Sequence, residues 1–235
     1  EDTRQTKKIM NKFNISNKLI SFNKHNSSIK IPKIIKDLRE GKSIAIVSDA
    51  GMPGICDPGE DIARCLKCEG IDIICIPGAC AAITALVSSG LPSSSFVFEG
   101  FLPKKKIDRE KILLEISKNE KTTIIYESPK RLIKSLKELL IFCGGDREIM
   151  VARELTKKFE EHVGNNINNV IEFFRGKDII GEITIVIKGI RTDSNPNKSI
   201  IKKDLNDLIN AGLSLSAASK YLAKKNGLKK SEIYN

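Results

Sequence analysis

Short runs of apolar and β-branched residues alternate with longer amphipathic stretches along most of the chain. The runs at 43–47 and 71–76 lack polar alternation, which is typical of parallel strands buried on both faces. Further strands are predicted at 18–22, 96–101, 122–126, 148–152, 159–163 and 183–187. Because strands and helices alternate, the sequence predicts an α/β fold.

The amphipathic stretches between these runs predict the helices, and several carry end signals. Pro32 opens one helix that Gly41 closes, and Gly90 ends another. At a third helix, Asp57 is expected to be the N-cap, with Pro58 in the first helical position. The predicted helices cover 1–10, 32–41, 58–69, 80–89, 108–118, 129–142, 168–175, 200–210 and 214–225, and a last one starts at Lys229.

Small residues follow the two continuous apolar runs, in the loops 48–54 and 77–82. Successive parallel strands end at the same edge of a sheet, so we expect the two loops to form one crevice. Neither loop has the glycine and lysine pattern of a nucleoside triphosphate site or the glycine pattern of a dinucleotide site. An acidic, backbone-rich loop suits a ligand with hydroxyls, an amine or a positive centre. The alternative is an ordinary strand-to-helix turn.

The domain boundaries are predicted where the succession of predicted strands and helices changes along the chain. An N-terminal α/β domain is expected at 1–93 and a second α/β domain at 94–190. Residues 191–198 have the composition of a linker, and 199–235 predict a helical tail that resembles a helix-turn-helix. The tail either binds nucleic acid or packs as an appendage on the body or on a partner.

The net charge of +11, from 40 basic and 29 acidic residues, predicts attraction to a polyanion. Residues 198–235 hold eight Lys against three acidic residues, which concentrates the charge in the tail. The alternative is a solvated, lysine-rich surface without a functional meaning.

Six cysteines lie mostly in apolar segments, so buried structural thiols are expected and not a zinc site or disulfides. No apolar run approaches the length needed to span a membrane, and the N-terminus lacks the layout of a signal peptide. We therefore expect a cytoplasmic protein.

Seven short motifs follow one another along the chain, at 1–4, 47–53, 57–59, 77–82, 98–103, 126–129 and 152–157. In this order they resemble the tetrapyrrole methylase family, in particular its ribosomal RNA small subunit methyltransferases I. That resemblance implies two α/β domains that close over S-adenosylmethionine (SAM) in the cleft between them. It also implies 2′-O-methylation of a cytidine ribose in the decoding region of 16S rRNA, within the small ribosomal subunit, and a homodimer.

The resemblance also assigns the cofactor site. Residues from the loops after the two apolar runs would line SAM, and residues of the second domain would approach it from the other side. The implied cofactor residues are Ser48, Asp49, Ala50, Gly51, Met52, Ile55, Cys80, Ala81, Ala82, Tyr126, Ser128, Gly181 and Glu182.

The chain departs from the family at three points. The family's first strand and its loop, which precede the motif at 1–4, are not in this sequence. Met52 stands where Thr is usual and Gly54 where Leu is usual. We expect the absent strand to leave backbone groups unpaired and the chain to be a poor methyltransferase as it stands.

Methyl transfer from a sulfonium requires in-line alignment and no metal, and a positioned base should help a ribose hydroxyl to react. The candidates for a catalytic role are Glu127, Glu154 and Lys157. An ion pair with a neighbouring cation is an equal alternative for Glu154.

Phosphate contacts supply much of the affinity for RNA, so Lys and Arg in and beside the motifs are the candidate RNA-binding residues. They are Arg4, Lys104, Lys105, Lys106, Arg131 and Arg153. Two other functions stay open: methylation of a tetrapyrrole such as a precorrin, and RNA binding without catalysis on the same fold. The basic loop at 103–106 and the basic tail favour RNA over a tetrapyrrole.

Overall fold

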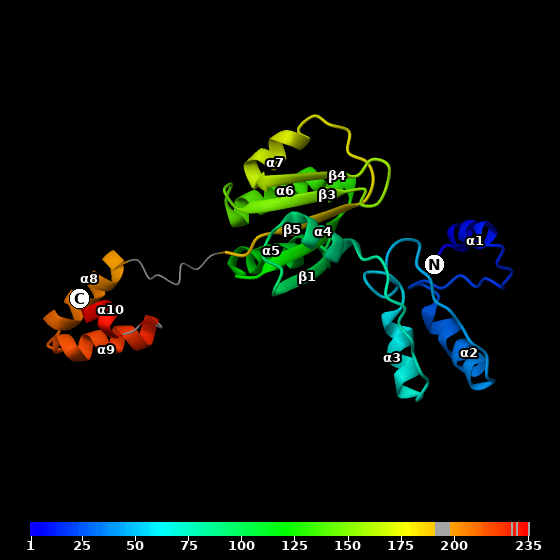
Figure 1. Ribbon diagram of the computed structural model, residues 1–235, viewed down its shortest axis with the longest axis horizontal. Coiled ribbons are helices and arrows are strands. Elements are labelled where there is room, and N and C mark those ends of the chain that lie inside the picture. The colour runs from blue at the N-terminus through cyan, green and yellow to red at the C-terminus, as the bar shows by residue number, and fades with distance from the viewer. Residues whose placement is uncertain (191–197, 227, 229, 235) are drawn as a thin grey trace. The chain divides into compact units, whose positions relative to one another are not determined.

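A computed structural model of the chain describes residues 1–190, 198–226, 228 and 230–234. The chain separates into two compact units, Glu1–Ile190 and Arg191–Asn235 (Figure 1). The predicted linker at 191–198 lies, except for Lys198, outside the described residues. Each unit is considered by itself.

A five-stranded sheet organises the first unit, with the strand order β1-β2-β5-β3-β4. Its strands are β1 (Phe96–Phe101), β2 (Thr122–Glu127), β3 (Glu148–Arg153), β4 (Glu161–Asn166) and β5 (Ile183–Ile187). β1 and β2 are parallel and are joined through helix α5 (Lys106–Lys118), while every other neighbouring pair is antiparallel. The predicted strand at 159–163 is therefore displaced to 161–166.

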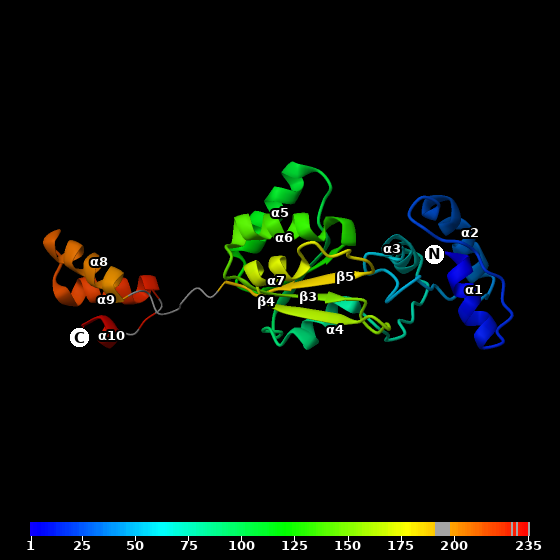
Figure 2. The same cartoon turned by 90° about the horizontal axis from the view of Figure 1, so that it is seen from above.

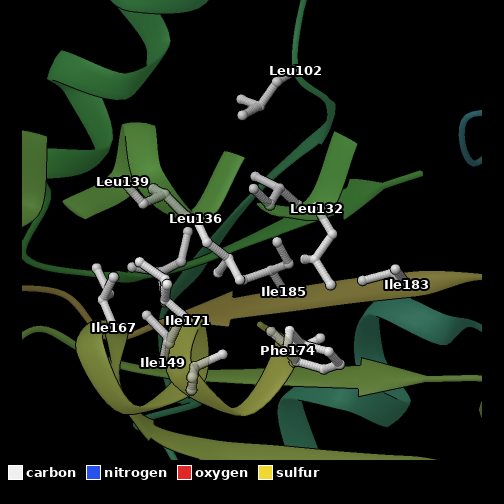
Figure 3. Close-up of a cluster of buried hydrophobic side chains, with 14 of the residues drawn as sticks. Leu102, Leu132, Leu136, Leu139, Ile149, Ile167, Ile171, Phe174, Ile183 and Ile185 are labelled. Carbon is white, nitrogen blue, oxygen red and sulfur yellow. The ribbon is translucent and has the colours of Figure 1, made fainter. Parts of the chain in front are cut away.

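Helices cover both faces of this sheet (Figure 2). α5, α6 (Pro129–Cys143) and α7 (Ile167–Phe174) lie on one face, and α4 (Ala81–Ser89) lies on the other. β5 alternates between the two cores, since Ile185 packs with α6 and α7 (Figure 3) while Val186 packs with α4. Burial on both sides explains why every residue of β5 is β-branched and why only Thr184 in it is polar.

The N-terminal part of this unit consists of helices and extended segments. α1 (Thr3–Lys12) is followed by α2 (Ser27–Arg39) and α3 (Glu60–Cys68), and α2 and α3 pack together around Ile31, Ile62 and Leu66. The strand predicted at 18–22 does not form; its last residue, Phe22, is buried in this small core.

The strands predicted at 43–47 and 71–76 are also wrong, because neither segment joins a sheet. Their apolar side chains are exposed, with 84% of Ile74 and 77% of Ile76 open to solvent. A parallel strand needs a hydrogen-bonded neighbour on at least one side, and no described strand lies beside either segment. Apolar sequence alone was therefore not enough to make these strands.

Two helix starts also differ from the sequence prediction. α2 begins at Ser27 and contains Pro32, so Pro32 does not open it. α3 begins at Glu60 with Gly59 as its N-cap, so Asp57 does not cap it. A Cβ on Gly59 would lie 2.8 Å from the Gly54 Cα, and this close backbone contact fixes the turn before α3.

The six cysteines are free thiols, and Cys68 and Cys75 are exposed, which corrects the expectation that they are buried. Cys75 is exposed because it belongs to the segment that does not enter the sheet. Among the described residues, no helix is long and apolar enough to cross a membrane.

The second unit is helical. It contains α8 (Lys198–Asn210), α9 (Leu215–Asn226) and α10 (Lys230–Tyr234) around a core that includes Ile201, Leu205 and Leu222. Gly212 has φ +95° in the turn between α8 and α9, a conformation that favours glycine. Two short helices around such a turn agree with the predicted helical tail.

Candidate active site

A cavity of about 480 Å³ lies in the first unit, between the loops before α3 and α4 and the ends of β2, β3 and β5. It is bounded on the sheet side by Tyr126, Ala152 and Thr184. The predicted cofactor residues that line it are Asp49, Ala50, Gly51, Met52, Ile55, Cys80, Ala81, Tyr126, Ser128, Gly181 and Glu182. The structure thus brings together segments that are far apart in the sequence.

Ser48 and Ala82, the other two predicted cofactor residues, are not among the residues that line the cavity. The Ser48 hydroxyl donates to the carbonyl oxygen of Gly51 at 3.0 Å, within the loop that does line it. Ala82 lies in the first turn of α4 and is buried, with 3% of its surface exposed.

Tyr126 connects the sheet to α4. Its hydroxyl oxygen accepts a hydrogen bond from the Ala82 backbone N–H at 3.1 Å, while its ring makes edge contacts with Phe98 and Phe101. Burial raises the pKa of the Tyr126 phenol to about 12, and the neighbouring Cys80 adds to this effect. The phenol therefore stays neutral and acts as a structural hydrogen-bonding group.

Glu127 borders the cavity but its carboxylate points into a buried polar network. One oxygen accepts from the Ser128 backbone N–H at 2.8 Å and lies 3.3 Å from Arg131 Nε. The other oxygen accepts from the Ser135 hydroxyl and lies 3.8 Å from the Arg109 guanidinium. With both oxygens engaged, Glu127 is arranged to hold the β2–α6 junction and not to accept a substrate proton.

A second group of charged residues lies at the cavity and consists of Glu154, Lys157 and Glu182. Lys157 and Glu182 line the cavity directly. Lys157 Nζ donates to Glu154 at 2.7 Å and to Glu182 at 3.0 Å. The Lys157 hydrogen bond lowers the pKa of Glu154, and the Glu154 hydrogen bond raises the pKa of Lys157. The Lys157 side chain therefore stays protonated, and the Glu154 carboxylate is a weak proton acceptor.

Gly181 has a steric reason to be glycine. A Cβ there would approach the Glu154 carboxyl carbon to 2.4 Å, and Gly181 has φ +98°. Glu154 also accepts from the Glu182 backbone N–H at 2.9 Å, and its own φ is +55°. These contacts lock two loops together on one side of the cavity.

The predicted RNA-binding residues divide into two groups. Lys104, Lys105 and Lys106 are exposed at the start of α5. Arg131 donates to the Leu102 carbonyl oxygen at 2.8 Å, so its guanidinium is used inside the protein.

Arg153 is likewise engaged, since it bonds Glu161 at 3.0 Å and the Ile180 carbonyl at 3.1 Å. Arg4 is 87% exposed but forms a two-pronged pair with Asp2, which it holds at a pKa of about 2. The lysines at 104–106 are exposed, although Lys106 lies 3.8 Å from Glu110.

Several cavity residues were not predicted, among them Cys56, Asp57, Thr84, Phe101 and Thr184. The sequence around Asp57 predicts a helix cap and gives no sign that Asp57 lies in the cavity wall. Cys56 could not be found from sequence, because its place depends on Gly100, where a Cβ would lie 2.9 Å from the Cys56 sulfur. Contacts between distant segments determine these positions.

The chain matches known proteins along its length. Residues 3–170 match the family described as tetrapyrrole (corrin/porphyrin) methylases. A protein of Halalkalibacterium halodurans named ribosomal RNA small subunit methyltransferase I is 40% identical over 240 residues, covering 100% of this chain and 83% of that protein. A protein of the same name from Thermotoga maritima is 43% identical over 189 residues, covering 80% of this chain and 84% of that protein.

The fold has solved counterparts as well. The uroporphyrin-III-C-methyltransferase of Thermus thermophilus superposes with a TM-score of 0.52 at 17% identity, covering 74% of each chain. This likeness concerns the fold, whereas the match to the Halalkalibacterium halodurans protein covers the entire chain at 40% identity. The protein therefore belongs to the tetrapyrrole methylase family and, within it, to the ribosomal RNA small subunit methyltransferases I.

Proposed function

We propose that the protein transfers a methyl group from SAM to the 2′-hydroxyl of a cytidine ribose in the decoding region of 16S rRNA. The observation that carries the proposal is the 40% identity, over the whole chain, to a protein named ribosomal RNA small subunit methyltransferase I. The cavity where two loops meet the sheet supports it, because it gathers most of the residues expected to hold the cofactor.

The cavity residues fit SAM chemically. Asp49 and Glu182 offer carboxylates to the amine, the hydroxyls and the sulfonium, and Lys157 offers an ammonium to the carboxylate. Met52 and Ile55 provide apolar surface for the adenine. When bound, SAM supplies an electrophilic methyl carbon on a positively charged sulfur.

The protein's own contribution is alignment. Tyr126 ties α4 to β2, and the Glu127 network fixes the start of α6, so both walls of the cavity are held in place. Glu154 and Lys157 act as a positioning pair on the third wall. Such rigidity matters because small errors in the approach of the ribose oxygen cost large factors in rate.

RNA is proposed to approach over the exposed Lys104, Lys105 and Lys106, with Arg4 and the lysines of α8 and α9 adding charge. We further propose that residues 1–93 and 94–190 act as two cofactor-enclosing domains. The protein would act in the cytoplasm as a homodimer on the assembled small ribosomal subunit.

The test is methyl transfer from tritiated SAM to small ribosomal subunits that lack the modification. We expect the label in 16S rRNA, at a single cytidine, and in a ribose that resists alkaline cleavage on its 3′ side. Uroporphyrinogen III is the comparison substrate and should stay unlabelled. SAM binding by calorimetry without any RNA methylation would favour a tetrapyrrole substrate, and RNA binding without SAM binding would favour a non-catalytic factor.

A further inference from the structure

A second cavity of about 340 Å³ adjoins the first, and none of the predicted cofactor residues lines it. It is lined by Phe22, Lys24 and Ser27 on one side and by residues 54 and 56–61 on the other. Cys56 and Asp57 line both cavities, so they form the wall between them. A group placed at this wall can touch ligands on either side.

We propose that the second cavity receives the target nucleotide and that Asp57 is the catalytic residue that accepts the proton of its ribose hydroxyl. This inference rests on the proposed methyl transfer to RNA. It adds the place where the nucleotide binds and the group that activates it.

Asp57 is singled out among the cavity carboxylates by its surroundings. The Glu127 carboxylate forms ion pairs with Arg109 and Arg131. Glu182 is paired with Lys157 at 3.0 Å. Asp49 accepts a hydrogen bond from the Asp2 backbone N–H at 2.8 Å. Asp49 and Glu1 line only the first cavity. In the part of the chain that the structure describes, Asp57 forms no ion pair with a Lys or Arg, and it faces both cavities.

The loop that carries Asp57 is held rigidly. Gly54 and Gly59 are in backbone contact on one side of it, since a Cβ on Gly59 would lie 2.8 Å from Gly54. On the other side, the Cys56 sulfur packs where a Cβ on Gly100 would be, 2.9 Å away. These contacts hold the loop backbone that places Asp57 at the wall between the two cavities.

The charges around Asp57 suit a base. Burial raises its pKa, and the negative charges of Glu1, Asp49 and Glu182 raise it further, against a lowering hydrogen bond from Ser48. A carboxylate whose pKa is closer to the working pH is a better proton acceptor.

The groups that face Asp57 from the second cavity are Lys24, Glu60 and Asp61. Lys24 is exposed and can meet the phosphate of a nucleotide. Glu60 offers carboxylate oxygens, which accept hydrogen bonds from the exocyclic amine of cytosine, while Asp61 is already paired with Arg64 at 2.9 Å. Phe22 supplies an apolar wall. The mixture suits a nucleoside better than a bare phosphate.

In the proposed step, the 2′-oxygen forms a bond to the methyl carbon while its proton moves to the Asp57 carboxylate. The carbon–sulfur bond breaks and its electron pair stays on sulfur, so a neutral thioether leaves. Asp57 then returns the proton to solvent. No other reactant is needed.

The first test uses the full chain and compares Asp57→Asn with Asp57→Glu and with a control, Asp72→Asn, on the exposed segment 71–76. Single-turnover methylation of small ribosomal subunits should fall at least about 100-fold in Asp57→Asn. Asp57→Glu should recover part of the rate, Asp72→Asn should keep it, and SAM affinity by calorimetry should change less than about threefold in all three. The wild-type rate should rise with pH on the acidic side, and Asp57→Asn should lose this rise.

The second test needs no cofactor. Cytidine 5′-monophosphate is added to wild-type protein labelled for NMR, and shifts are expected at Lys24 and in residues 56–61 but not in α6. Shifts confined to other regions, or an Asp57→Asn rate within threefold of wild type, would overturn the inference. If wild type neither binds SAM nor methylates RNA, the proposed function itself fails, which is a distinguishable result.

Discussion

The phenolic oxygen of Tyr126 on β2 accepts a hydrogen bond from the backbone N–H of Ala82, in the first turn of α4, at 3.1 Å. The N-cap residue of α4, Cys80, makes no side-chain capping bond, so Tyr126 satisfies one of the donors that every helix N-terminus leaves open. One hydrogen bond thus joins the sheet to the helix that follows the second cofactor loop. The motifs at 77–82 and 126–129 are therefore in direct contact.

Tyr126→Phe should therefore destabilise the first unit by about 1 to 2 kcal/mol, since the Ala82 N–H would be left without its partner. Urea unfolding followed by circular dichroism measures this loss. Tyr221→Phe is the matched control, because Tyr221 is 56% exposed on α9, and it should change stability by less than about 0.5 kcal/mol. Equal effects in both variants would show that the hydrogen bond has no structural role.

The second half of the first unit could be predicted closely from sequence. β1, β2, β3 and β5 lie where their apolar runs predict, and α6 starts at Pro129 as expected. These elements are mutually supporting, because β2, β3 and β5 each bury alternate residues in the cores on the two faces of the sheet. Local pattern and tertiary packing agree there, so the pattern is a reliable guide.

The N-terminal half shows the opposite case. The segments 43–47 and 71–76 have the same apolar character as β5, yet they remain outside the sheet. A strand is a property of at least two chain segments, and apolar sequence does not say whether a partner is present. Asp57 shows a second limit of sequence-based prediction. Its sequence neighbours predict a helix cap, whereas its place in the cavity wall depends on segments far away in the sequence.

The extended segments 43–47 and 71–76 should exchange their amide hydrogens rapidly. Their backbone groups take no part in the sheet, whereas residues 183–187 are paired on both sides by β2 and β3. Hydrogen exchange read by mass spectrometry should show the two segments labelled within the first time points and β5 protected far longer. Protection in 43–47 equal to that in β5 would mean that the segment is paired in solution.

Arg109 is expected to be the most costly of the charged residues to remove. It is 4% exposed and contacts Glu127, Ser135 and Glu138. Arg109→Met would leave buried Glu127 with one fewer cation, at a cost of about 3 to 5 kcal/mol in the free energy of unfolding.

Lys106→Met provides the control for Arg109→Met. Lys106 lies on the same helix and its pair with Glu110, at 3.8 Å, is exposed, so the loss should stay below about 1 kcal/mol. Chemical denaturation of both variants makes the comparison. If the two losses are similar, the buried network does not stabilise the β2–α6 junction.

The pair of Glu154 and Lys157 predicts a pH dependence. Lys157 lowers the pKa of Glu154 below its ordinary value of 4.5, so the Glu154 contribution to stability is present above that value and is lost as the pH falls through the lowered pKa. Glu154 raises the pKa of Lys157 above 10.5, so that contribution is present below 10.5 and is lost as the pH rises through the raised pKa. Carboxyl NMR titration of Lys157→Met should return the Glu154 pKa toward 4.5. An unchanged Glu154 titration would assign the shift to another neighbour.

RNA affinity should depend on salt through the lysines at 104–106. These residues are exposed at the start of α5, and each phosphate contact contributes roughly 0.7 to 0.9 to the slope of log affinity against log salt. Replacing all three by Gln should lower both the affinity for small ribosomal subunits and this slope, while SAM affinity stays constant. Replacing Lys111, Lys118 and Lys121 by Gln removes the same charge along and beyond α5 and serves as the matched control. If both triple variants lose the same slope, the effect comes from net charge, and the proposed path of RNA over 104–106 is wrong.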